Sequence, residues 1–219
     1  MSVAPASERI YRELRRRIIF AELKPAEEID VTEAAAEFGT SRTPVRDALH
    51  RLDHDGLVRI RPRALCQVSP VTLKTVVDVL DVREATGPMA TRLAVNHATA
   101  DDVDALEAIA ENGYAGAEDV RSILSASHLF HCRVAKLSGN RRLHDITEMA
   151  LEDLERVFRL CGRQPLEPEQ PLADHRALLQ VFRAGDAEEA ARLELDHIRR
   201  GREVVMKVAI DSGFFFREG

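Results

Sequence analysis

Helical periodicity is the feature that most constrains the fold, because it runs almost without a break from residue 71 onward. Capping-box spacing marks two of the helix starts, at Thr99 with Asp102 and at Asp186 with Glu189. No alternating strand pattern appears in this part of the chain, so we predict an all-helical bundle. Its helices are expected near residues 72–96, 101–112, 118–138, 141–161, 170–184 and 187–211.

The first 70 residues follow a different plan, with three short helical segments and then an alternating one. The helical segments are expected at 7–21, with Ser7 as N-cap, at 31–38, and from Ser41, which caps the third. In the stretch LVRIRPRALCQVSP, apolar and polar residues alternate on both sides of Pro62, which predicts a two-stranded hairpin. Three helices and a small hairpin describe a winged helix-turn-helix.

The predicted fold class is therefore mainly α, with an N-terminal winged helix-turn-helix in residues 1–70 and a helical bundle in residues 71–219. The two parts also differ in charge. Residues 1–70 hold 12 of the 31 Lys and Arg residues and 11 of the 37 Asp and Glu residues, a balance of +1, which leaves −7 for the remainder. The N-terminal part is thus the one that can approach an anionic polymer.

Composition narrows the class of protein. The 219 residues are 45% hydrophobic and 31% charged, as in soluble globular proteins, and no apolar run is long enough for a membrane span or a secretion signal. The three cysteines, at 66, 132 and 161, show neither metal-ligand spacing nor a disulfide framework. These features predict a cytoplasmic protein without a membrane partner.

The start of the third segment carries side chains suited to DNA. In a helix-turn-helix, the second helix enters the major groove with its N-terminal end leading. That end here contains Ser41, Arg42, Thr43 and Arg46. The two arginines are four residues apart and share a face, where their planar groups can bind guanine edges or phosphate oxygens. In the predicted hairpin, alternate positions hold Arg59, Arg61 and Arg63, which would form a basic wing.

The stretch TSRTPVRDALHRLDHDGLV closely resembles the signature of the GntR superfamily of bacterial transcription regulators. The preceding stretch, IIFAELKPAEEIDVTEAAAEFG, is similar to the first helices of that family, so the resemblance covers residues 8–70. It implies that Ser41, Arg42, Thr43 and Arg46 contact double-stranded operator DNA and that the hairpin, with Arg61 and Arg63, is the wing. One departure is that Ala64 or Leu65 stands where family wings have glycine.

Three histidines of the helical part lie on separate predicted helices, each on a partly apolar face: His131, His175 and His197. Imidazoles that converge inside a bundle would bind a divalent transition metal and leave positions open for water or an anion. The alternative is that each is a structural histidine of the core. Spacing alone leaves both interpretations open.

Three stretches of this part resemble the FCD ligand-binding domain of the FadR branch of the same superfamily: VLDVREATGPMATRLA, FHCRVAKLSGN and DHRALLQVFRAGDAEEAARLELDHI. The resemblance implies a divalent metal, zinc or nickel, bound by one Asp and three His. The three histidines match, but Ser127 occupies the position of the Asp, four residues before His131. The resemblance thus implies a three-histidine site without its carboxylate. Helix geometry permits His128, three residues before His131, to take the place of the Asp.

Arg83, in the stretch DVREATGP, matches an arginine that faces the ligand cavity in domains of this kind. There it would bind the carboxylate of a small organic-acid effector. The alternative is a surface ion pair, for example with Asp81.

These features together predict a metabolite-responsive regulator that binds palindromic operator DNA as a homodimer. We predict that it is not an enzyme, because no Asp or Glu is placed as a general base beside the histidines and an enzyme would leave the DNA-binding part unexplained. The remaining alternative is the same DNA-binding part with a helical domain that only dimerises, without metal or effector.

Overall fold

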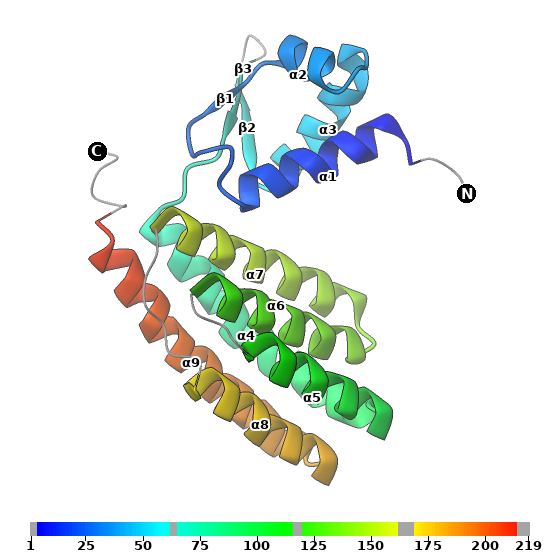
Figure 1. Cartoon of the computed structure of the whole chain (residues 1–219), viewed down its shortest axis with the longest axis vertical. Coiled ribbons are helices and arrows are strands. Elements are labelled where there is room, and N and C mark those ends of the chain that lie inside the picture. The colour runs from blue at the N-terminus through cyan, green and yellow to red at the C-terminus, as the bar shows by residue number, and fades with distance from the viewer. Residues whose placement is uncertain (1–3, 62–64, 116–119, 162–168, 214–219) are drawn as a thin grey trace. The chain divides into compact units, whose positions relative to one another are not determined.

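The structure is a computed structural model, and it describes residues 4–61, 65–115, 120–161 and 169–213 (Figure 1). The chain divides into two compact units, Met1–Val71 and Thr72–Gly219, which we call the head unit and the helical unit. Each is described by itself. Among the described helices, none has the length and apolar character needed to span a bilayer.

The head unit contains the predicted three helices and hairpin. Its helices are α1 (Ala6–Ile19), α2 (Val31–Glu37) and α3 (Arg42–His54). Its strands are β1 (Glu28–Ile29), β2 (Val58–Arg61) and β3 (Leu65–Val68), which form an antiparallel sheet in the order β1-β3-β2. The apolar stripes of the helices meet over one face of this sheet, where the side chains with almost no exposure include Ile18, Val45, Leu52, Val58 and Val68.

The head unit differs from the prediction in two places. Helix α1 begins after Pro5 and not at Ser7, because the Pro5 carbonyl already accepts hydrogen bonds from the amides of Glu8 and Arg9. Strand β1 was not predicted, because two residues are too short to show alternation. It forms because Ile29 lies opposite Cys66 of β3 and is buried there.

The helical unit contains six helices in its described part, as predicted. They are α4 (Leu73–His97), α5 (Ala100–Tyr114), α6 (Val120–Leu137), α7 (Arg141–Cys161), α8 (Glu169–Ala184) and α9 (Ala187–Asp211). Thr99 caps α5 in a reciprocal capping box with Asp102, and the Asp186 side chain accepts a hydrogen bond from the amide of Glu189 at the start of α9. Gly139 adopts a positive φ of 69° just before α7, a conformation that favours glycine.

Helices α4 and α9 form the longest packing interface of the unit and run antiparallel (Figure 1). Ion pairs mark the two ends of this interface, from Arg92 to Glu188 and from Arg202 to Asp81. Helix α4 also packs against α6 and α7, and α8 packs against α5 and α9. The middle of α9 therefore faces α4 on one side and α8 on the other, which places Glu194 inside the bundle and partly buries His197.

Candidate functional site

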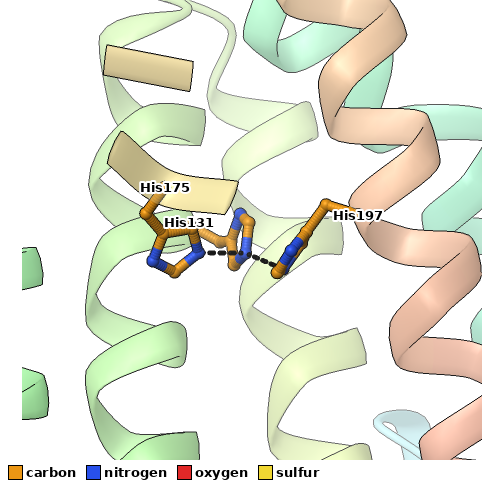
Figure 2. A group of neighbouring side chains, drawn as sticks. All are labelled: His131, His175 and His197. Atoms are coloured by element: carbon orange, nitrogen blue, oxygen red, sulfur yellow. Dashed lines mark hydrogen bonds between the residues drawn. The ribbon is translucent and has the colours of Figure 1, made fainter. Parts of the chain in front are cut away.

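Three histidines from three helices meet inside the helical unit (Figure 2). His131 on α6 and His175 on α8 are 2% and 1% exposed, and His197 on α9 is partly buried. The Nε2 atom of His131 lies 3.1 Å from Nε2 of His197 and 3.3 Å from Nε2 of His175. Two ligands about 2.0–2.1 Å from one tetrahedral metal lie about 3.3 Å apart. These two separations are therefore close to those that a single metal requires, and the ligand atoms of all three histidines lie within 4.8 Å of one another.

Two carboxylates orient the imidazole rings from behind. Glu194 Oε1 lies 3.2 Å from His131 Nδ1, and Asp174 Oδ2 lies 2.9 Å from His197 Nδ1. When each Nδ1–H donates to its carboxylate, the Nε2 atom keeps its lone pair and points into the cluster. This carboxylate–histidine arrangement is the one in which protein histidines bind metals.

Burial keeps His131 and His175 in their neutral, metal-binding form. It lowers the pKa of His131 to about 4, against the opposing effect of Glu194. It also lowers the pKa of His175 well below the ordinary value of a histidine. The Nδ1 atom of His175 is buried and has no hydrogen-bond partner among the described residues. At neutral pH both rings thus present lone pairs, which a cation can accept.

Sequence reasoning missed Glu194. This side chain is 3% exposed, and its Oε1 also lies 3.5 Å from Nη2 of Arg83. Burial alone would raise the pKa of Glu194, but His131, His197 and Arg83 lower it to about 2, so it is ionised. The available signal was spacing, because Glu194 lies three residues before His197 and so shares its helix face.

Arg83 lies inside the unit and not on its surface. Its side chain is 9% exposed, and Asp81, the alternative partner, pairs with Arg202 instead at 2.7 Å. The interpretation of Arg83 as a surface ion pair is therefore wrong. Burial lowers the pKa of Arg83, and Glu194 counteracts this effect.

The charges around the histidines almost cancel. The negative charge of Glu194 is offset by Arg83, whose Nη2 lies 3.5 Å from Glu194 Oε1. The negative charge of Asp174 is offset by Arg200, whose Nη2 lies 2.9 Å from Asp174 Oδ1. The three imidazoles are neutral in their metal-binding form. A divalent cation at their Nε2 atoms would therefore bring a double positive charge that no side chain of the cluster offsets, and such a centre favours an anionic ligand.

A cavity of about 490 Å³ lies beside the cluster. Arg83 and His197 both line it, and so do Ser127 and His128 from α6. Among the described residues, the group whose ligand atoms lie within 4.8 Å of one another consists of the three histidines alone. The structure thus brings together the three predicted histidines and places Ser127 and His128 on the cavity wall.

The predicted DNA-reading residues lie at the exposed start of α3. The side chains of Ser41, Arg42, Thr43 and Arg46 are all exposed, and Ser41 occupies the N-cap position. In the part of the head unit that the structure describes, Arg42 and Arg46 form no ion pair. Other arginines of this unit do form ion pairs, namely Arg12, Arg16, Arg17 and Arg51.

The predicted wing is only partly described. Arg59 and Arg61 are exposed on β2. Arg63 and Ala64 lie outside the described residues, and so does the side chain of Leu65.

Two family models match separate parts of the chain. Residues 6–68 match the family model of bacterial regulatory proteins of the gntR family, and residues 78–200 match that of the FCD domain. The chain belongs to the GntR family of regulators with an FCD domain. A probable D-xylose utilization operon transcriptional repressor of Paenarthrobacter nicotinovorans is 30% identical over 173 residues, 76% of this chain and 74% of that protein.

Other GntR-family comparisons cover more of the chain. The HTH-type transcriptional regulator YdhC of Bacillus subtilis (strain 168) is 27% identical, covering 88% of both chains. The solved structure of E. coli McbR/YncC superposes with a TM-score of 0.79 over 94% of this chain and 99% of that one, at 20% identity, and shows the likeness of fold. The family and its relative YdhC are transcription regulators and not enzymes, which confirms the prediction of a transcription regulator and the prediction that the chain is not an enzyme.

Proposed function

We propose that this GntR-family protein is a cytoplasmic, metabolite-responsive regulator of the FadR branch that binds palindromic operator DNA as a homodimer. We assign to its helical unit a divalent transition metal, zinc or nickel, held by His131, His175 and His197. We assign to the adjoining cavity a small organic-acid effector. The observation that carries the proposal is the approach of the three Nε2 atoms to 3.1 and 3.3 Å beside a cavity.

The DNA contacts are assigned to the start of α3. Arg42 and Arg46 are exposed and form no ion pair within the described residues, so binding a phosphate or a guanine breaks no existing bond. Ser41 and Thr43 lie beside free amides of the helix N-terminus, which favour phosphate. We assign a supporting role in the wing to Arg61, which is exposed, and to Arg63.

The donor set fits a borderline transition metal, because imidazole nitrogen suits zinc and nickel better than it suits magnesium or calcium. Such a metal supplies a Lewis-acidic centre with positions open to a carboxylate. Glu194 and Asp174 hold the rings, and Arg83 on the cavity wall directs its planar group to the anionic end of the effector.

Homodimer formation is supported by exposed apolar side chains on two helices that pack together. Val82 and Met89, seven residues apart on α4, are 43% and 44% exposed. Ile146 and Met149 on α7 are 38% and 45% exposed. We propose that these helices meet a second copy of the chain and so set the spacing of two recognition helices.

DNA binding is tested by selecting bound fragments from random-sequence DNA and measuring their affinity by fluorescence anisotropy. Replacing Arg42 with Ala should weaken operator binding by about 1–3 kcal/mol. Arg12→Ala, which removes the same charge from α1, where Arg12 pairs with Glu8, should have a much smaller effect. Equal affinity of Arg42→Ala and the unaltered protein would exclude Arg42 from the interface.

The metal is tested by elemental analysis of protein purified without a histidine tag. About one zinc or nickel per chain is expected, with loss in His175→Ala and retention in His144→Ala, a histidine of α7 outside the cluster. Operator binding is then measured with and without metal and organic acids. If neither changes it, the helical unit serves dimerisation only.

A further inference from the structure

The cavity beside the histidines is polar at one end and apolar at the other. Polar side chains gather near the cluster, where Arg83 comes from α4 and His197 and Arg200 come from α9. Away from the cluster, the wall is largely formed by aliphatic and aromatic side chains of three helices: Leu80, Leu151, Leu154, Phe158, Val204 and Val205. It also includes one carboxylate, Glu155, that is paired with Arg159. The effector site that the proposed function assigns therefore has two chemically different halves.

The change in character follows the antiparallel pair α4 and α9. Along α9 the lining passes from His197 to Val204 and Val205, and eight residues of helix span about 12 Å. Along α4 it passes from Arg83 back to Leu80, one turn toward the N-terminus. Because the two helices run in opposite directions, both changes point the same way. The apolar end of the cavity thus lies one to two helical turns from the histidines.

From this arrangement we infer that the effector is an amphipathic monocarboxylate, with its carboxylate at the histidine cluster and Arg83 and an aliphatic or aromatic body at the apolar end. This inference rests on the proposed function and narrows its effector class. A volume of about 490 Å³ suits a ligand on the order of ten to fifteen non-hydrogen atoms.

The same wall selects against hydrophilic acids of similar size. A sugar acid would bring several hydroxyl groups against the aliphatic and aromatic side chains of this wall, which neither donate nor accept hydrogen bonds. Each buried hydroxyl without a partner lowers affinity on the order of tenfold. The wall also disfavours a second acidic group on the ligand, because two arginines near it are already paired with carboxylates of the protein. Glu155 lines the cavity and is engaged by Arg159 at 2.6 Å, and Asp174 is engaged by Arg200.

Calorimetric titration of the zinc-loaded full chain tests the inference with three probes. Octanoate has the proposed chemistry, gluconate has the carboxylate without the apolar body, and 1-octanol has the apolar body without the carboxylate. We expect octanoate to bind on the order of 100-fold more tightly than either of the other two.

Two variants of α9 locate the apolar body. Val204→Asp introduces a charge at the apolar end and should weaken octanoate binding at least tenfold. Ile210→Asp introduces the same charge on the same helix at a side chain that is 50% exposed, and should leave octanoate binding unchanged. Val204 is itself partly exposed, so the variant is expected to fold, and its melting curve verifies this.

The outcomes separate the inference from the proposed function. Tighter binding of gluconate than of octanoate, or an unaffected Val204→Asp protein, would overturn the amphipathic effector while leaving an organic-acid sensor in place. Equal binding of octanoate and 1-octanol would show that the carboxylate is not recognised and would overturn both. If no carboxylate binds and none changes operator affinity, the proposed function fails with it.

Discussion

Glu194 gives the sharpest test of the metal centre, because it is the carboxylate closest to His131 and was not predicted to take part. The substitution Glu194→Gln retains an oxygen that can accept the His131 Nδ1–H, so it removes charge with little change of shape. Removing a group that orients a metal-binding histidine typically lowers metal affinity 10–100-fold. Since each factor of ten is about 1.4 kcal/mol, the expected loss is about 1.4–2.7 kcal/mol.

The structure places the expected loss near the upper end of that range. Glu194 also neutralises Arg83, whose Nη2 lies 3.5 Å away at a buried position. In Glu194→Gln the guanidinium faces the metal without a counter-charge, which adds repulsion to the loss of orientation. We therefore expect zinc affinity to fall about 100-fold.

The assay is competition for zinc between metal-free protein and a chromophoric chelator. Glu203→Gln is the matched control, because Glu203 is an exposed carboxylate of the same helix and its loss removes the same charge. A second variant, Arg83→Met with Glu194→Gln, removes both buried charges and should regain about tenfold of the lost affinity. Zinc affinity of Glu194→Gln within threefold of the unaltered protein, with a normal melting curve, would refute the reasoning.

Three further predictions concern stability. Leu52→Ala should lower the free energy of unfolding of the head unit by about 2–5 kcal/mol in urea titration, because the side chain is fully buried in α3; a loss below 1 kcal/mol would contradict this packing. Gly139→Ala should lower the free energy of unfolding by about 1–2 kcal/mol, because Gly139 has a φ of 69°. Gly201→Ala should raise it by about 0.5–1 kcal/mol, because Gly201 lies inside α9 with open space around the added carbon. The metal-free protein should lose stability as pH falls from about 6.5 to about 4, because the unfolded chain takes up a proton at His131 that the folded chain, with a pKa of about 4, does not; equal melting temperatures at pH 7 and pH 4.5 would exclude this.

The helices of this chain were predictable from sequence because their apolar spacing is long and regular. All six helices of the helical unit begin and end within a few residues of the predicted positions. Strand β1 shows the opposite case, because two residues carry no periodicity and the strand exists only through its pairing with β3. Local pattern thus determined the elements, whereas pairing of distant segments required the structure.

The candidate site, too, was only partly predictable from sequence. Their places on separate predicted helices and the resemblance to FCD domains both pointed to His131, His175 and His197, which the structure brings together. That Ser127 leaves a metal site without its usual carboxylate stays a prediction. Sequence reasoning did not identify Glu194 or Asp174, because their roles depend on how α6, α8 and α9 pack. The apolar end of the cavity was equally hidden, since it combines side chains of α4, α7 and α9 whose proximity no local spacing encodes.

The position of Glu194 bears on how metal and effector act together in the proposed sensor. A carboxylate that bound the metal directly would neutralise part of its charge, whereas Glu194 reaches His131 Nδ1 and leaves the cavity side to Arg83 and His197. The effector's own carboxylate would then provide the negative charge that balances the metal. Metal and effector must in that case strengthen each other's binding by the same factor, because coupling between two sites is reciprocal. The presence of Ser127, where the family has Asp, is therefore compatible with the proposed sensor. Its consequence is that metal affinity depends on the presence of the effector.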